Sequence, residues 1–348
     1  MRVLRLYGTD SQTAAAAFDQ DQALLARAST GGGQEAFLRL WRRPATGLAL
    51  GRFHRMDPGH RNDGGGGMER RLSGGRAVVV GPGVLGLSMV FPDLAWLGGE
   101  ELAPRQVPNR ALRPLLQALR ALGVDAFYAG RDLLTADRRT LAHVSFTRMP
   151  DGVWICEQHL AVSQDFSQLG RLTDELDPRR IAAIDGGAYD ESVSLEELSG
   201  VGAEARLLAL LAEQCRQEFD CEVVEEGPCG AAAASDPGGR DGIGAFEAFQ
   251  AERGPLCEGR VSAAAISILG AVEASAESSG GVIHDLRIDG DLIAPFYTLE
   301  AVGQELEGQA LEKSVIEGCL ARVLERPGNF ILGADQLATV IGRLAPAP

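Results

Sequence analysis

Apolar residues in the first 220 positions recur either with helical spacing or in short runs typical of strands. Asp10 or Ser11 is placed to cap a helix that runs to about residue 28. Asn109 likewise precedes a stripe of leucines that ends at Gly123. Further apolar segments predict strands at 3–7 and within 124–166 and a helix at about 203–219, and residues 38–50 and 77–91 are also rich in apolar side chains. Helices and strands are therefore mixed in this part of the chain.

The pattern changes after residues 228–242, which are rich in Ala, Gly, Asp and Pro and predict a loop or linker. Val261–Ala274 and Val282–Ile288 predict two strands with a turn at residues 278–281 between them. Two helical stretches follow, near 299–306 and 311–324. We therefore expect a second, smaller unit beyond residue 256.

Composition narrows the class of protein. The chain has 348 residues, of which 45% are hydrophobic and 23% charged, as expected for a globular protein. Its net charge of -15 argues against a general nucleic-acid binder. No signal-peptide pattern and no apolar run of about 18 residues occurs, so we expect a cytoplasmic protein with no membrane span. The cysteines and histidines form no CxxC or HExxH pattern, so we expect no metal site.

Candidate chemistry concentrates in the segment Arg70-Arg71-Leu72-Ser73-Gly74-Gly75-Arg76. Adjacent glycines let backbone N–H groups approach an oxyanion, and arginine suits phosphate or carboxylate. A hairpin turn with solvated arginines is the alternative that the spacing alone leaves open.

The same segment, continued through Ala77-Val78, resembles the signature loop of the lipoate–protein ligase family, relatives of biotin ligases and octanoyl transferases. The segment Gly47–Arg52 resembles the family's strand and Gly-Arg turn, and Ile288-Asp289-Gly290-Asp291-Leu292 resembles a step in its small accessory domain. The resemblance spans nearly the whole chain. It implies an α+β fold: a catalytic domain over residues 1–254, with a mostly antiparallel sheet flanked by helices, and an accessory domain over 256–345.

The family resemblance also implies an activity. Such a ligase activates lipoate or octanoate with ATP and transfers the acyl group to a lysine of a lipoyl carrier domain. By resemblance, the substrate-binding residues are Arg70, Arg71, Ser73, Gly74, Gly75 and Arg76, with Gly51 and Arg52 at the edge of the site and His143 facing it. For His143, a purely structural role is an equal alternative.

This sequence departs from the family on the ligand side. Lys313 is the only lysine of the chain, and the family's active-site lysine aligns with Thr140 or, shifted by one residue, with Arg139. Val80, Gly81, Val84 and Gly86 stand where the ligases carry His-Asp and two asparagines, and Glu157-Gln158-His159 replaces a His-Gly-Thr signal.

Three functional hypotheses follow. The first is an acyl ligase or acyltransferase of low or altered activity, in which Arg139 and Thr140 occupy the catalytic position. The second is a lysine-less relative that binds or regulates lipoyl carrier proteins. The third is a biotin-type ligase, which the loop and the accessory domain disfavour. A lysine restored at Thr140 is expected to raise activity if the pocket is otherwise intact.

Overall fold

The computed structural model describes residues 1–55, 67–99, 101–167, 191–228, 248–249, 260–279 and 281–344. Its largest feature is an eight-stranded sheet with the order β11-β1-β2-β6-β10-β9-β8-β7. The strands are β1 (Val3–Ser11), β2 (Glu35–Arg42), β6 (Val84–Phe91), β7 (Ala126–Tyr128), β8 (Leu133–Ala136), β9 (Arg139–Arg148), β10 (Trp154–Ala161) and β11 (Glu222–Pro228). Only the pairings of β1 with β2 and β11 are parallel, so the sheet is mostly antiparallel, as predicted.

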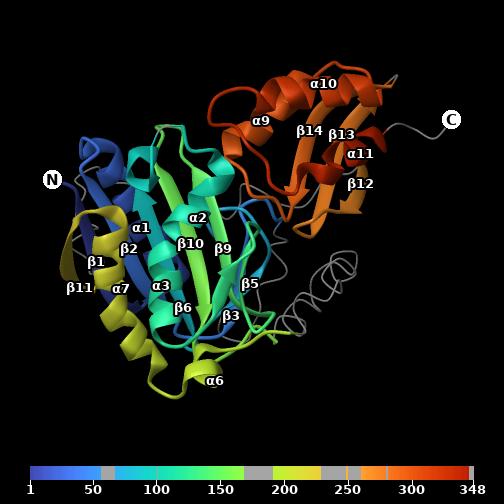
Figure 1. Cartoon of the computed structure of the whole chain (residues 1–348). Coiled ribbons are helices and arrows are strands. Elements are labelled where there is room, and N and C mark those ends of the chain that lie inside the picture. The colour runs from blue at the N-terminus through green and yellow to red at the C-terminus, as the bar shows by residue number, and fades with distance from the viewer. Residues whose placement is uncertain are drawn as a thin grey trace.

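Helices cover both faces of this sheet (Figure 1). They are α1 (Ala14–Thr30), α2 (Val107–Ala111), α3 (Arg113–Ala121), α6 (Leu195–Ser199) and α7 (Ala203–Phe219), with short 3-10 turns at Leu94–Leu97 and Pro104–Gln106. On β2, Phe37 packs on the side of α1, whereas Leu38 joins the core beneath α3 and α7. Because both faces are covered, the interior of this strand is buried throughout.

A small second sheet, with the order β4-β3-β5, carries the arginine- and glycine-rich loop. Strand β3 (Gly47–Leu50) lies between β4 (Met68–Arg70), to which it is parallel, and β5 (Val78–Val80), to which it is antiparallel. The loop, Arg71–Ala77, joins the two outer strands of this sheet. Its two ends are therefore held on either side of the same central strand.

The C-terminal segment forms a three-stranded antiparallel sheet covered by helices, and it lies at one end of the large sheet (Figure 1). Its elements are β12 (Val261–Ile266), β13 (Ala271–Ser279), β14 (Val282–Gly290), α9 (Phe296–Leu306), α10 (Lys313–Leu324), a 3-10 turn at Ala334–Gln336, and α11 (Leu337–Gly342). The segment has a hydrophobic cluster of its own, to which Phe53 of the first unit is added. The expected boundary near residue 255 lies outside the described residues, so both domain ranges remain predictions.

Several local predictions differ from the structure. Thr13, whose side chain accepts from the N–H of Ala16, caps α1, because residues 10 and 11 still belong to β1. Asn109 lies inside α2 instead of at its start. The expected strand 261–274 is two strands with a turn at residues 267–270 between them. The helix at 203–219 has the predicted ends, and no helix among the described residues is long and apolar enough to span a membrane.

Candidate functional site

The signature loop lies against the turn that follows β3. The N–H of Arg71 donates to the carbonyl of Leu50, and the N–H of Arg52 donates to the carbonyl of Ser73, both at 2.9 Å. A β-carbon at Gly51 would overlap the carbonyl oxygen of Gly75, so only glycine permits this close approach. Gly51 and Arg52 therefore border the loop.

Arg71 is the internal support of the loop. Its guanidinium donates to three backbone carbonyls, those of Ala49 at 2.8 Å, Gly74 at 2.9 Å and Arg76 at 2.6 Å. The side chain is 7% exposed. A planar fork with five N–H donors suits this task, because it reaches carbonyls on both sides of the turn. The structure thus directs this arginine into the loop's own backbone.

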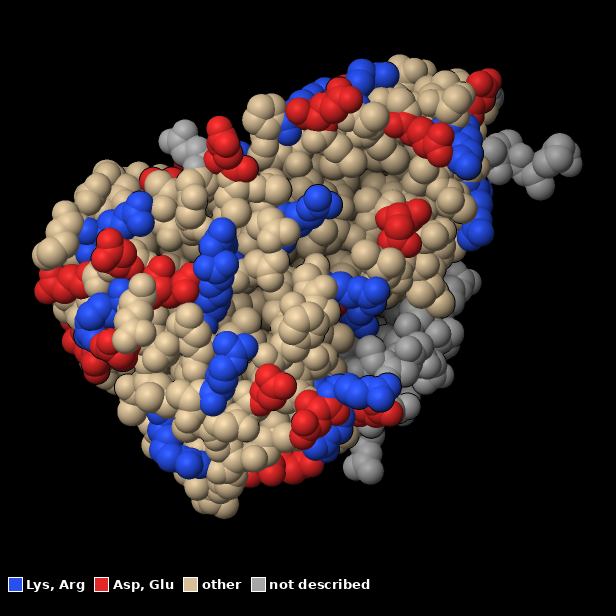
Figure 2. All heavy atoms as spheres, viewed as in Figure 1, with Lys and Arg blue, Asp and Glu red and all other residues tan. Residues whose placement is uncertain are grey.

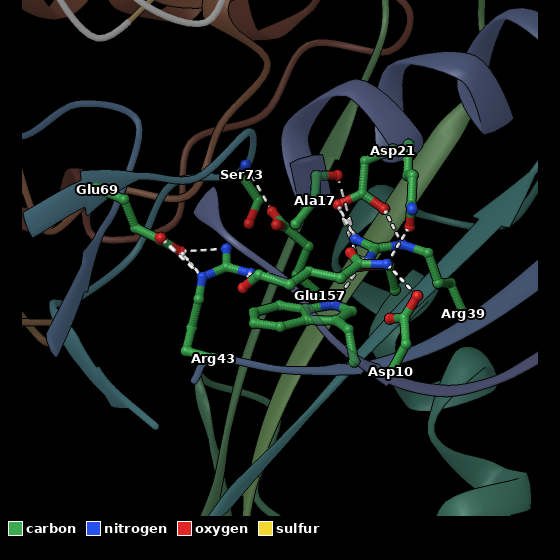
Figure 3. Close-up of polar contacts among 12 residues, drawn as sticks. Asp10, Ala17, Asp21, Arg39, Arg43, Glu69, Ser73 and Glu157 are labelled. Carbon is green, nitrogen blue, oxygen red and sulfur yellow. Dashed lines mark hydrogen bonds and ion pairs between the residues drawn. The ribbon is translucent and has the colours of Figure 1, made fainter. Parts of the chain in front are cut away.

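The side chain of Glu157, in β10, contacts the backbone of the loop. The backbone N–H of Ser73 donates to its carboxylate at 2.7 Å (Figure 3). The hydroxyls of Ser73 and Ser145 lie 2.5 Å apart. Burial raises the pKa of Glu157, Asp21 adds to the increase, and Arg71 opposes it. A carboxyl group of the protein therefore occupies one of the loop's backbone donors.

The C-terminal unit occupies a second donor. The N–H of Gly75 donates to the carbonyl of Leu292 at 2.6 Å. A β-carbon at Gly74 would overlap the same carbonyl oxygen, so this close contact also requires glycine at position 74. His54 completes the junction, because its Nε2 lies 2.8 Å from Asp291 and 3.2 Å from the carbonyl of Gly75.

The remaining loop arginines also have partners. Arg76 Nε donates to Asp132, which directly precedes β8, at 2.5 Å. Burial raises the pKa of Asp132 although Arg76 acts to lower it. Arg70 donates to the carbonyl of Phe249 at 3.1 Å, and Arg52 lies over the ring of Phe249, 5.0 Å from its centroid. These cations are therefore engaged by the protein itself.

The residues expected at the lysine position are placed at the start of β9. Arg139 pairs with Glu197 of α6 at 2.6 Å, and both side chains are partly exposed. Thr140 is 3% exposed, and its backbone bonds to the segment that includes Val193. His143 is also buried, with its ring 4.6 Å from that of Phe166. The exposed ion pair directs Arg139 to α6 rather than into the loop.

A small pocket lies between α1 and the segment Arg70–Leu72. Its lining is Ala14, Ala17, Phe18, Asp21, Trp41, Arg43, Glu69, Arg70, Arg71, Leu72, Glu157 and His159. The residues from Ser73 to Arg76 do not line it, nor do Gly51, Arg52, Arg139, Thr140 or His143. Its volume is about 20 Å³, enough for a water-sized group.

Two buried ion pairs include residues that line the pocket: Asp21, whose partner Arg39 lies behind the lining, and the pair of Arg43 and Glu69 (Figure 3). Arg39 pairs with Asp21 at 2.7 Å, and Arg43 pairs with Glu69 at 2.5 Å. Trp41 extends over Gly86, where a β-carbon would overlap the indole ring. The sequence analysis did not select these wall residues. Isolated charges inside apolar strands, such as Arg39, were the signal that could have identified them.

Further features of the structure bear on its chemistry. Cys156 is fully buried, and burial raises the pKa of its thiol to about 12, so a nucleophilic role is disfavoured. Within the described residues, no group of three or more metal-binding side chains occurs. Basic and acidic side chains are interspersed on the face shown in Figure 2.

Comparison with solved structures defines the class of the fold. P. falciparum LipL1 in complex with lipoate matches with a TM-score of 0.67 at 13% identity, covering 94% of this chain and 95% of that one. A lipoate protein ligase from Thermoplasma acidophilum, from a study that includes its E2 lipoyl domain, matches at 0.54 with 16% identity, covering 72% and 91%. Lipoate-protein ligase A bound with ATP matches at 0.52 with 16% identity, covering 72% and 94%. The fold is therefore that of the lipoate ligases.

The family model of the lipoyl protein ligase A/B catalytic domain matches residues 13–196, which is more than half of the chain. The chain belongs to this family. No curated protein matches its sequence.

Proposed function

We propose that this chain is a lipoyl ligase relative that binds an acyl ligand and a lipoyl carrier domain without forming the acyl-adenylate. The observation that carries the proposal is the engagement of the loop's backbone donors. The N–H of Ser73 donates to Glu157, and the N–H of Gly75 donates to Leu292. A phosphate oxygen bound by this loop needs donors of this kind, because they stabilise developing negative charge only when aimed at it.

The charged side chains support the same conclusion. Arg71 is directed into the loop's carbonyls, and Arg76 pairs with the buried Asp132. A phosphate would have to displace the carboxylate from Arg76, and the two negative groups would repel each other. The loop thus keeps the residue pattern that resembles the family's, while its cations pair with groups of the protein itself.

The family lysine has no counterpart in this chain. Thr140 supplies no charge, and Arg139 forms a pair at the surface with Glu197. Loss of one preorganised donor from such a site costs on the order of 100- to 1000-fold in rate. We therefore assign no ATP-dependent step to this protein.

The proposed ligands are a medium-chain acid, such as lipoate or octanoate, and a lipoyl carrier domain. LipL1 is described in complex with lipoate, and the T. acidophilum ligase together with its E2 lipoyl domain. Family membership and the overall fold support the same ligand classes here.

The decisive experiment incubates the protein with ATP, lipoate and an unmodified lipoyl domain, and reads the carrier by intact mass. We expect no mass increase, together with direct binding of the carrier in calorimetry. Octanoate replaces lipoate in a parallel reaction, and release of pyrophosphate reports adenylate formation. An ATP-dependent increase in carrier mass contradicts the proposal. Absence of carrier binding contradicts the proposal that the protein binds a lipoyl carrier domain.

A ligase of low activity is the second candidate, because a pocket persists beside Arg70 and Arg71. In that case Arg70, which lines the pocket, holds the activated acid. Pyrophosphate release that depends on both ATP and the acid, and that Arg70→Ala weakens, would favour this candidate.

A further inference from the structure

The pocket between α1 and Arg70–Leu72 is lined by a residue with a buried polar atom that has no partner among the described residues. His159 of β10 lines the pocket and is 1% exposed. Its Nε2 has no hydrogen-bond partner among the residues that the structure describes. The edge of its ring contacts Trp41, with the centroids 5.5 Å apart. An unsatisfied buried nitrogen is unfavourable, so a group that bonds to it is stabilised there.

The charge of the walls indicates which kind of group fits. Three guanidinium groups, those of Arg43, Arg70 and Arg71, and three carboxyl groups, those of Asp21, Glu69 and Glu157, line the pocket. The charges balance, so the walls provide no net field for an anion or a cation. Burial and the nearby Arg71 lower the pKa of His159, which keeps the imidazole neutral. A neutral ring can donate or accept through Nε2, depending on its tautomer.

The size of the pocket limits the group further. A volume of about 20 Å³ admits a group of the size of a water molecule. A hydroxyl meets this limit, whereas a primary amide, with three heavy atoms, exceeds it. A dithiolane ring exceeds it too, and it also offers no hydrogen-bond partner to the imidazole.

We propose that this pocket binds the neutral, hydrogen-bonding end of an acyl ligand, a hydroxyl group, and that His159 is the specificity residue. The inference rests on the proposed function in that it takes the ligand to be an acyl compound. It changes the preferred substrate class from a plain or dithiolane-bearing acid to one with a polar end.

The test compares 8-hydroxyoctanoate, octanoate and lipoate by calorimetry with the full-length protein. We expect the hydroxy acid to bind about tenfold more tightly than octanoate, because the apolar chain leaves the imidazole unsatisfied. His159→Phe keeps the aromatic ring and removes the nitrogen, so it should bring the two affinities to within about twofold. His159→Gln keeps a polar group and should retain part of the preference. His284→Gln, which changes a half-exposed histidine in β14, is the matched control and should behave like the natural protein.

Thermal melting verifies that each variant is folded. The inference is overturned if the natural protein prefers octanoate or lipoate, if His159→Phe keeps the preference for the hydroxy acid, or if none of the three acids binds. Carrier-domain binding is measured separately without any acid. Carrier binding without a hydroxyl preference therefore refutes this inference alone. A hydroxyl preference without carrier binding refutes the carrier-binding part of the proposed function.

Discussion

Replacement of Arg71 by methionine separates a structural role from a ligand-binding role. The guanidinium donates to three carbonyls at 2.6–2.9 Å and is nearly buried. Hydrogen bonds with a charged partner contribute about 1.5–3 kcal/mol each, and losses within one network are not additive. Methionine retains much of the apolar stem but satisfies none of the carbonyls. We therefore expect the free energy of unfolding to fall by about 3–6 kcal/mol, a large part of the about 5–15 kcal/mol typical of a domain.

The measurement is urea denaturation followed by fluorescence and circular dichroism. Arg113→Met is the matched control, because Arg113 forms a partly exposed pair with Glu218, and such pairs contribute about 0–1 kcal/mol. Arg71→Lys should lose nearly as much stability as Arg71→Met, since a single ammonium cannot span carbonyls on both sides of the turn. A loss below about 1 kcal/mol for Arg71→Met, comparable to that of an exposed pair, would refute the structural assignment. A large drop in ligand affinity would then favour a binding role.

Three further changes test the site. Gly74→Ala should lower the free energy of unfolding in urea by about 1–3 kcal/mol, because the added β-carbon overlaps the carbonyl of Leu292. Gly227→Ala is the control and should leave the stability unchanged, because a β-carbon there lies in open space. Equal losses of stability in the two variants would contradict the packing argument. The folded-state pKa of Glu157 is raised, so stability is highest below its ordinary pKa and falls as pH rises through the folded pKa. Glu157→Gln should remove this loss of stability with rising pH. If the free energies of unfolding of both proteins vary in parallel across pH 4–8, Glu157 is not the cause of the loss. Thr140→Lys alone should yield no ATP-dependent pyrophosphate release, because the loop's donors remain engaged; robust release would show that the lysine was the only missing element.

The sequence predicted an element well where its limits depend on residues close in the chain, and less well where they depend on pairing with another element. The helix at 203–219 was predicted with its ends, because its apolar positions repeat along a single element. The cap of α1 was misplaced, because pairing with β2 extends β1 to residue 11. The single strand expected at 261–274 is a hairpin, because Gly270 and the segment 267–270 reverse the chain.

The sequence by itself determined the family, the mixed α+β class and the absence of a lysine from the position where the family carries one. It also located the loop, because Arg70–Ala77 is a contiguous motif whose residue types have local meaning. Only the tertiary structure showed which groups of the protein accept hydrogen bonds from the backbone of the loop. Ser73 meets Glu157, 84 positions away, and Gly75 meets Leu292 of the C-terminal unit. Such contacts depend on strand order, register and the docking of two units, which no short-range pattern of apolar and polar residues encodes.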